Sequence, residues 1–184
     1  MVLLFLLLIA LVAIGFHLYL INDSQQVSDS YNPSKHTVSL ETLLSVEEVR
    51  LLALTAYKYD SPADLIPLQA KLLDTARQLN MSTADIDFIN SPRLLTYLRF
   101  NAAREWFELE VEKTYQNLGD LTPIKEKYPE AKDLFASAEA LFAKRDDILQ
   151  EIATEIASEQ NQIANKTHME TARAIWLERI NKDE

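Results

Sequence analysis

The hydrophobic positions of this chain fall into two patterns, and the first is a long apolar run at the N-terminus. Residues 2–21 form an almost unbroken apolar stretch in which His17 is the one strongly polar side chain. A helix rises about 1.5 Å per residue, so a run of this length spans the roughly 30 Å hydrocarbon core of a bilayer. The run therefore predicts one N-terminal transmembrane helix that contacts the lipid bilayer through residues 2–21.

Two other interpretations of this run fit the sequence less well. A cleaved signal peptide carries basic residues before its apolar core and ends at a small-residue cleavage site. No Lys or Arg precedes the run, and cleavage after Gly15 would leave a mature chain that starts with the mostly apolar residues 16–21. A buried core helix would need packing partners on every side. We therefore interpret residues 1–21 as an uncleaved, single-pass signal-anchor.

The charges that follow the run predict its orientation. Cytoplasmic flanks of membrane helices carry an excess of Lys and Arg. The first basic residue after the run is Lys35, and Asp23 and Asp29 precede it. This distribution favours a plasma (inner) membrane protein whose helical domain is extracytoplasmic.

The second pattern begins near residue 39 and indicates helices. Residues 22–38 are polar, rich in Ser and Asn and without period, as in a flexible linker. Over residues 39–184 apolar positions recur every three or four residues, and Ser followed by Pro gives helix starts at 61–62 and 91–92. No stretch alternates with period two, so we predict an all-α domain. Its expected helices before the C-terminal segment cover residues 39–59, with a capping box at 45–48 as an alternative start, 62–80, 82–89 and 92–117.

The C-terminal part of the chain predicts one long helix. Residues 130–181 contain no Gly or Pro, and an uninterrupted helix of that length would measure about 78 Å. The polar residues 159–162 and a capping box at 167–170 leave a second option, in which the chain breaks near 165–167 and folds Trp176 back on the bundle. The prediction we adopt is the continuous, projecting helix. Its apolar stripe contains Leu134, Ala138, Leu141, Ile148, Ile152, Ile156 and Ile163.

Two predictions about packing follow from these helices. Leu98 and Trp106 of the preceding helix are expected to share one core with Leu141 and Ile152 of the C-terminal helix. Gly119 is expected to take the left-handed conformation that ends many helices, since Gly adopts it without steric cost.

A projecting C-terminal helix also predicts a binding surface. Beyond residue 167, apolar side chains again follow one face of the helix. Aromatic anchors dominate the binding energy of many interfaces, and this face contains a Trp. We therefore predict that it binds a protein partner or a second copy of the chain. The residues of this face are Met169, Ala172, Ile175, Trp176 and Ile180.

Charge and composition narrow the classes of function. The formal net charge is −10, whereas nucleic-acid binding relies on clustered Lys and Arg, so we expect no nucleic-acid partner. The chain has no Cys, which excludes disulfides, thiolate nucleophiles and thiolate metal sites. Its two Gly residues, at positions 15 and 119, cannot form a Gly-rich phosphate loop. We expect no cofactor.

The remaining candidates for catalysis form no recognised constellation. The three His residues are His17, His36 and His168, and the i, i+2 spacing of His168 and Glu170 places their side chains on different helix faces. We therefore expect His168 to be an exposed surface residue and expect no metal site. Arg145 is the one charge on the C-terminal apolar stripe. We expect its side chain to extend off the edge of the stripe to solvent, with a buried or partner-facing ion pair with a carboxylate as the alternative.

Together these patterns indicate a non-enzymatic protein. We interpret the chain as a membrane-anchored interaction, accessory or assembly subunit of a membrane or envelope complex. The alternative is a membrane-tethered hydrolase, or a small-ligand-binding or sensor domain, with a site built from scattered carboxylates, Tyr and Arg. A stoichiometric protein partner would support the first interpretation, and a deep polar pocket would support the second.

Overall fold

The computed structural model describes residues 38–183 of the chain. Contacts between residues divide the chain into two units, Met1–Thr37 and Val38–Glu184. The predicted transmembrane helix and residues 22–37 of the predicted linker lie outside the described residues. Among the residues that are described, no helix combines the length and the apolar character needed to cross a membrane.

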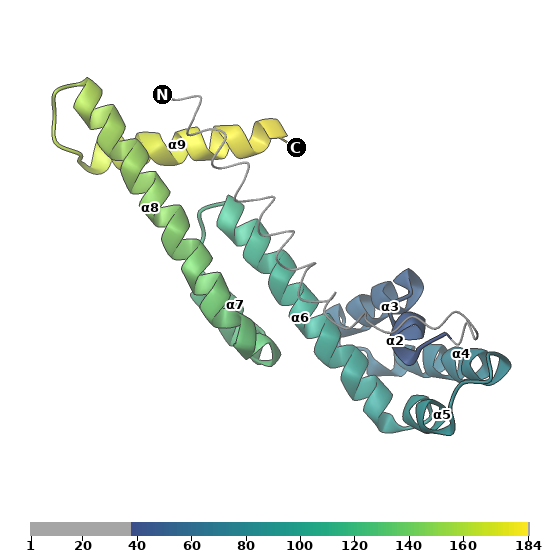
Figure 1. The fold of residues 1–184 in the computed structure, drawn as a ribbon. Helices are drawn as coiled ribbons and strands as arrows, with labels where there is room; N and C mark the ends of the chain where they lie inside the picture. Colours follow the sequence, from purple (N-terminus) through teal and green to yellow (C-terminus); the bar gives the residue numbers. More distant parts are fainter. Residues whose placement is uncertain (1–37, 184) are drawn as a thin grey trace. The chain divides into compact units, whose positions relative to one another are not determined.

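Residues 38–183 fold into helices without any strand, which confirms the predicted all-α helical bundle (Figure 1). Three of the predicted helix starts are capped by serine: Ser39 Oγ accepts from the backbone N–H of Thr42 at 3.1 Å, Ser82 Oγ from that of Asp85 at 3.1 Å, and Ser91 Oγ from that of Arg93 at 3.2 Å. The α-helices are α2 (Leu40–Leu44), α3 (Glu47–Lys58), α4 (Leu65–Gln78), α5 (Thr83–Ile89), α6 (Pro92–Gln116), α7 (Thr122–Lys127), α8 (Phe135–Glu159) and α9 (Lys166–Asp183). Two 3₁₀ helices, η1 (Pro62–Asp64) and η2 (Pro129–Leu134), precede α4 and α8.

Helix α6 buries two different faces, one in each half. The buried residues are Leu94, Leu98 and Ala102 in the first half, and Ala103, Phe107 and Val111 in the second half. Because successive helical residues turn by about 100°, these two sets lie on opposite sides of the helix. The first set packs with α2 to α5, and the second packs with α7, η2 and the start of α8. The described residues therefore contain two main hydrophobic clusters, joined by α6.

The prediction of one shared core is consequently wrong in its detail. Leu98 is buried in the first cluster, whereas Trp106 is half-buried and packs against both clusters. Leu141 and Ile152 are also half-buried rather than buried. A prediction that follows one face along the whole helix misses this arrangement, because the buried face of α6 changes between Ala102 and Ala103.

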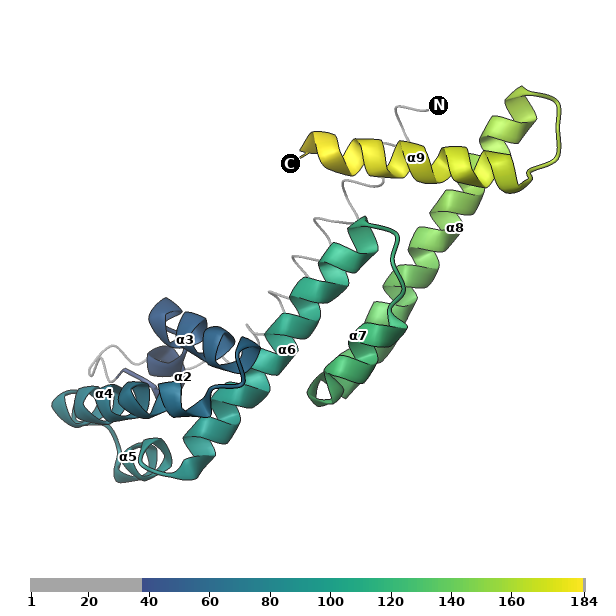
Figure 2. The same ribbon diagram turned by 180° about the vertical axis from the view of Figure 1, so that it is seen from behind.

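The predicted continuous C-terminal helix is wrong. Helix α8 ends at Glu159, a six-residue connection follows, and α9 begins at Lys166 and crosses back over α8 (Figures 1 and 2). Asn161 has a left-handed backbone with φ 55°, and the N–H of Gln162 donates to the carbonyl of Ala157 at 2.8 Å. This is a Schellman motif, which ends a helix by giving its last carbonyls new donors. The fold-back that the sequence offered as the second option is the observed structure.

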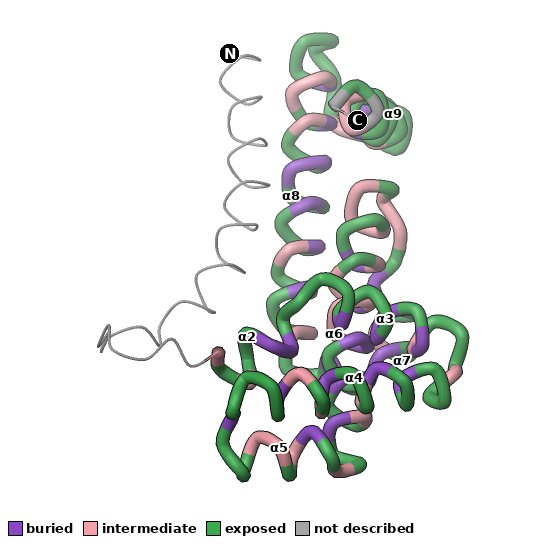
Figure 3. Tube along the Cα trace, turned by 90° about the vertical axis from the view of Figure 1, so that its right-hand side faces the viewer, coloured by how far each residue is buried: buried purple, intermediate pink, exposed green. Residues whose placement is uncertain are grey.

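Buried positions recur along α8 (Figure 3), but apart from Ala138, Arg145 and Ile148 they lie beside the predicted stripe rather than on it. Ile156 of that stripe is half-buried and Ile163 is 91% exposed. Small side chains let a second helix approach closely. Helix α9 packs against α8, whose C-terminal half has the small buried residues Ala153 and Ala157. The buried residues of α8 are Ala138, Phe142, Arg145, Ile148, Leu149, Ala153 and Ala157.

The turn after α6 uses glycine for space rather than for a left-handed backbone. Leu118 takes the left-handed conformation with φ 56°, and Gly119 does not, which corrects the prediction for Gly119. The N–H of Gly119 donates to the carbonyl of Thr114 at 2.8 Å, so the two backbones lie close together. A Cβ atom at position 119 would lie 2.6 Å from Cγ2 of Thr114.

This close approach predicts that Gly119→Ala destabilises the protein. Overpacking costs about 1 to 3 kcal/mol, which exceeds the roughly 0.4 to 1 kcal/mol that a Gly-to-Ala change gains from the unfolded chain. The measurement is urea unfolding of the detergent-solubilised chain, followed by circular dichroism. Thr114→Ser removes the opposing methyl group, so the double variant should regain most of the lost stability. Equal stability of Gly119→Ala and the parent chain would contradict this account.

Candidate interaction surface

The predicted partner-binding residues of α9 do not form one exposed face. Ala172 and Trp176 are buried, with 0% and 4% of their surface exposed. Met169 and Ile180 are half-buried, and Ile175 is 45% exposed. The projecting helix on which this prediction depended is not observed. Binding of a partner through the exposed parts of α9 stays a prediction.

Trp176 packs against the C-terminal end of α6. Its indole Nε1–H donates to the carbonyl of Gln116 at 3.0 Å, and its ring meets Tyr115 edge-to-face with centroids 5.4 Å apart. The last carbonyls of a helix lack intrahelical donors, so this hydrogen bond satisfies one of them. Trp176 therefore contributes to packing within the chain, which is the role that the projecting-helix prediction excluded.

His168 is buried, with 4% of its surface exposed, so the prediction of a surface residue is wrong. Its Nδ1 accepts from the backbone N–H of Asn165 at 3.2 Å, and its Nε2 lies 3.2 Å from Oε1 of Gln160. An accepting Nδ1 requires the tautomer with the proton on Nε2, which then donates to Gln160. The side chain of Asn165 caps α9 by accepting from the N–H groups of Thr167 and His168. His168 therefore stabilises the connection between α8 and α9.

Arg145 is also buried, with 6% of its surface exposed, which corrects the expectation that it extends to solvent. Its guanidinium donates to the carbonyl of Gly119 at 3.1 Å and to Asp146, with the closest ion-pair contact at 2.8 Å. The same group lies 4.5 Å from the ring centroid of Phe142 and 5.9 Å from that of Tyr115. A buried charge is stable only when its donors lie near acceptors or aromatic faces, and these contacts meet that need for Arg145. They also hold the turn after α6 against α8.

Two carboxylates of α6, Glu108 and Glu110, have pKa values that are shifted by their surroundings. Although burial raises its pKa, Glu110 is held below its usual pKa by hydrogen bonds from Lys127 and Tyr128. The Tyr128 hydroxyl lies 2.7 Å from Oε1 of Glu110, and burial raises the pKa of Tyr128 to about 12. Burial also raises the pKa of Glu108, against the opposing charge of Arg104. Within residues 38–183, no group of three or more His, Asp or Glu side chains is placed to hold a metal ion.

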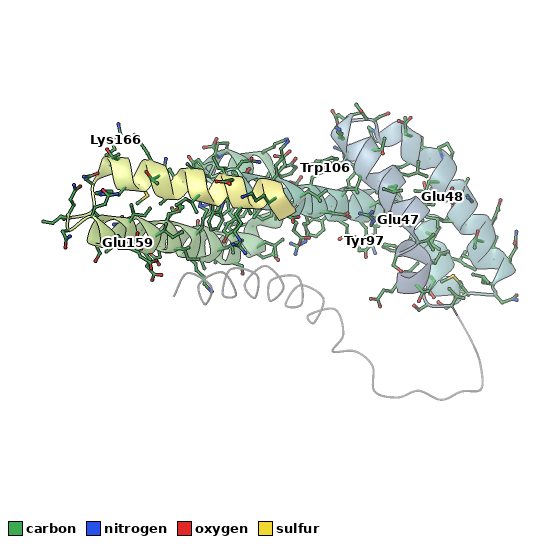
Figure 4. The ribbon with its side chains drawn as sticks, turned by 90° about the horizontal axis from the view of Figure 1, so that it is seen from above. Glu47, Glu48, Tyr97, Trp106, Glu159 and Lys166 are labelled. Carbon is green, nitrogen blue, oxygen red and sulfur yellow. The ribbon has the colours of Figure 1, made fainter. Side chains whose placement is uncertain are left out.

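A row of aromatic and basic side chains follows α6 from its first turn to its middle, and all of them are exposed except the half-buried Arg104. We call these residues the α6 stripe: Arg93, Tyr97, Phe100 and Arg104. Tyr97 is 42% exposed and Phe100 is 43% exposed, and Tyr97 is labelled in Figure 4. Tyr97 rests edge-on against Phe88 of α5 with centroids 6.0 Å apart, and the Arg104 guanidinium lies 5.4 Å from the Phe100 ring. The stripe is thus partly ordered by neighbours and open to solvent.

Other apolar side chains are exposed on the helical hairpin formed by α3 and α4. An exposed ion pair between Glu48 and Lys71, at 2.8 Å, joins the two helices. The exposed side chains of this hairpin lie on α3, at its C-terminal cap and on the first turn of α4. They are Leu51, Leu52, Tyr59 and Ile66, which are 48%, 39%, 69% and 59% exposed. This hairpin and the α6 stripe are the surfaces on which a protein partner would find aromatic and aliphatic contacts.

The α6 stripe was not predicted from the sequence. Its residues have the 4, 3, 4 spacing of one helix face, so the pattern itself is visible in the sequence. Periodicity does not tell which apolar face of a helix is buried, and the first half of α6 has apolar residues on more than one face.

Comparison of the chain with protein-family models, with curated proteins and with solved structures finds no match. The interpretation of these surfaces therefore depends on their own geometry and chemistry.

The position of Trp176 predicts that it is a core residue for stability. Trp176→Ala should lower the free energy of unfolding by about 3 to 5 kcal/mol, because it leaves a cavity beside Tyr115 and an unpaired carbonyl at Gln116. Trp176→Phe should cost less, since it keeps much of the ring contact. Urea unfolding of the detergent-solubilised chain measures both. The matched control is Leu177→Ala, which changes a 36% exposed neighbour and should cost under about 1 kcal/mol. Similar losses for Ala at both positions would contradict the observed packing of α9.

Proposed function

We propose that this protein is a membrane-anchored, non-enzymatic interaction subunit that serves as an accessory or assembly component of a membrane or envelope complex. The observation that carries the proposal is the set of exposed aromatic and aliphatic side chains on α3, α4 and α6. Interface centres are enriched in Tyr, Phe and Arg, which are the residue types of the α6 stripe. The described helices thus combine a packed interior with surfaces suited to protein contacts.

The membrane part of the proposal is supported by the sequence. Residues 2–21 have the length and apolar character of a single span, and the mostly polar residues 22–38 that follow connect it to the helical domain. A coil of that length has an r.m.s. end-to-end distance of about 20 to 25 Å. Such a tether would keep the domain close to the bilayer. The first basic residue after the run is Lys35, so we place the domain on the extracytoplasmic side of the plasma (inner) membrane.

Anchoring and orientation are tested with a reporter enzyme fused after Glu184 that is active only outside the cytoplasm. The fusion should be active and should stay in the membrane fraction after an alkaline wash. Leu8→Arg with Val12→Arg should release the chain from that fraction, because charged residues at the centre of a span are costly. An inactive fusion, together with an active cytoplasmic reporter at the same position, would reverse the orientation. Release of the parent chain by the wash would refute the anchor.

The interaction function is tested by purifying the tagged full chain from membranes in mild detergent after brief chemical crosslinking. A partner present in a fixed ratio to the chain is the expected result. An unrelated tagged single-pass protein, expressed at the same level, gives the background. If the chain yields only background proteins and remains a monomer, the proposed function is wrong.

A further inference from the structure

We propose that the α6 stripe binds an acidic amphipathic helix of a protein partner. The inference rests on the proposed interaction function and names the chemistry of the partner. The stripe places one basic residue at each end and two aromatic residues between them. Its complement is a helix segment with apolar side chains in the middle and carboxylates at both ends.

The stripe is a single face of a regular helix. Arg93, Tyr97, Phe100 and Arg104 lie within about 60° of one another around the α6 axis, at 100° per residue. They lie on the side opposite the buried Leu98. The rise from the first to the last stripe residue is about 16 Å, which is three turns of helix. A partner helix running alongside would need carboxylates separated by a similar length.

The charges favour an acidic occupant. Helix α6 carries no Asp or Glu between Pro92 and Arg104, although the formal net charge of the chain is −10. Among the described residues, Arg93 is exposed and makes no ion pair. Arg104, whose side chain is 25% exposed, pairs with Asp133, whose side chain is 63% exposed. Because the carboxylate of this pair is open to solvent, a competing carboxylate can exchange with Asp133.

Part of this side of α6 is covered by a segment of the same chain. Toward the C-terminus the stripe side continues into the face that contains Ala103, Phe107 and Val111, and η2 with the start of α8 packs there. That covering segment supplies Asp133 to Arg104 and the ring of Phe135 to Phe107, with centroids 5.4 Å apart. The segment that packs on this side of α6 within the chain thus combines a carboxylate with an apolar group. In the first half of the helix Arg93, Tyr97 and Phe100 are exposed, and the ring of Phe88 contacts the stripe at Tyr97.

A lipid surface fits the stripe less well than an acidic helix. Attraction to anionic lipid grows with the number of basic residues near the membrane surface. The stripe has only two basic residues, one of them already paired with Asp133, and the chain as a whole is strongly acidic. A protein segment with two localised carboxylates avoids this repulsion, because it contacts the stripe alone.

The test is site-specific photocrosslinking in the full chain, in the cells that produce it. p-Benzoylphenylalanine replaces Phe100, and in a parallel sample it replaces Leu51, which is 48% exposed on α3. Each sample is made in three backgrounds: the parent sequence, Arg93→Glu, and Arg173→Glu as a control with the same change in net charge at an exposed position of α9. Mass spectrometry then identifies the crosslinked segment.

The expected result is an adduct at position 100 with a segment of another protein that carries carboxylates about eleven residues apart in an apolar helical pattern. Arg93→Glu should reduce its yield at least fivefold, Arg173→Glu should leave it unchanged, and Arg in place of the captured carboxylate should restore the yield with Arg93→Glu. An adduct with lipid, with the chain itself or with a segment that lacks this pattern overturns the inference. No adduct, or equal yields in all backgrounds, also overturns it. If a stoichiometric partner still co-purifies in those cases, the proposed function stands and only the assignment to the α6 stripe fails.

Discussion

The burial of two opposite faces of α6 is the constraint on which the rest of the described structure depends. Leu98 and Ala102 on one face pack against α2 to α5, and Phe107 and Val111 on the other pack against α7, η2 and the start of α8. Trp106 lies between the two clusters, and its indole N–H donates to the carbonyl of Leu54 at 3.0 Å. A helix that serves two clusters in succession leaves in each half a face that no cluster covers. In the first half that face is the α6 stripe.

The return of α9 completes the second half of the domain. Three contacts converge near the end of α6: Trp176 on the carbonyl of Gln116, Arg145 on the carbonyl of Gly119, and the Tyr115 ring beside both side chains. Each hydrogen bond gives a donor to a carbonyl at or just beyond the helix end, where carbonyls lack intrahelical partners. Trp176, which was predicted to bind a partner, and Arg145, which was expected to extend to solvent, therefore both pack within the fold.

The surfaces that remain available for recognition are those left over once this packing is complete. On α9 only part of the predicted surface is exposed, whereas Tyr97 and Phe100 on α6 are both more than 40% exposed. The same side of α6 is covered by the chain's own acidic and aromatic segment in its second half and is open in its first half. This contrast between a covered and an open stretch of one helix face is the strongest structural support for a protein-binding role.

Local features of the sequence determined the class of fold and many helix ends. Period-3.6 patterning and Ser or Ser-Pro caps gave the all-α prediction and the starts of α5 and α6, because these signals act within one or two turns of chain. The tertiary structure decided which faces are buried, whether residues 130–181 form one helix or two, and the burial of Arg145 and His168. Those outcomes depend on partners far along the chain, such as Gly119 for Arg145 and Gln116 for Trp176. The same holds for the α6 stripe. The spacing of its residues can be recognised in the sequence, but its exposure depends on where the other helices pack.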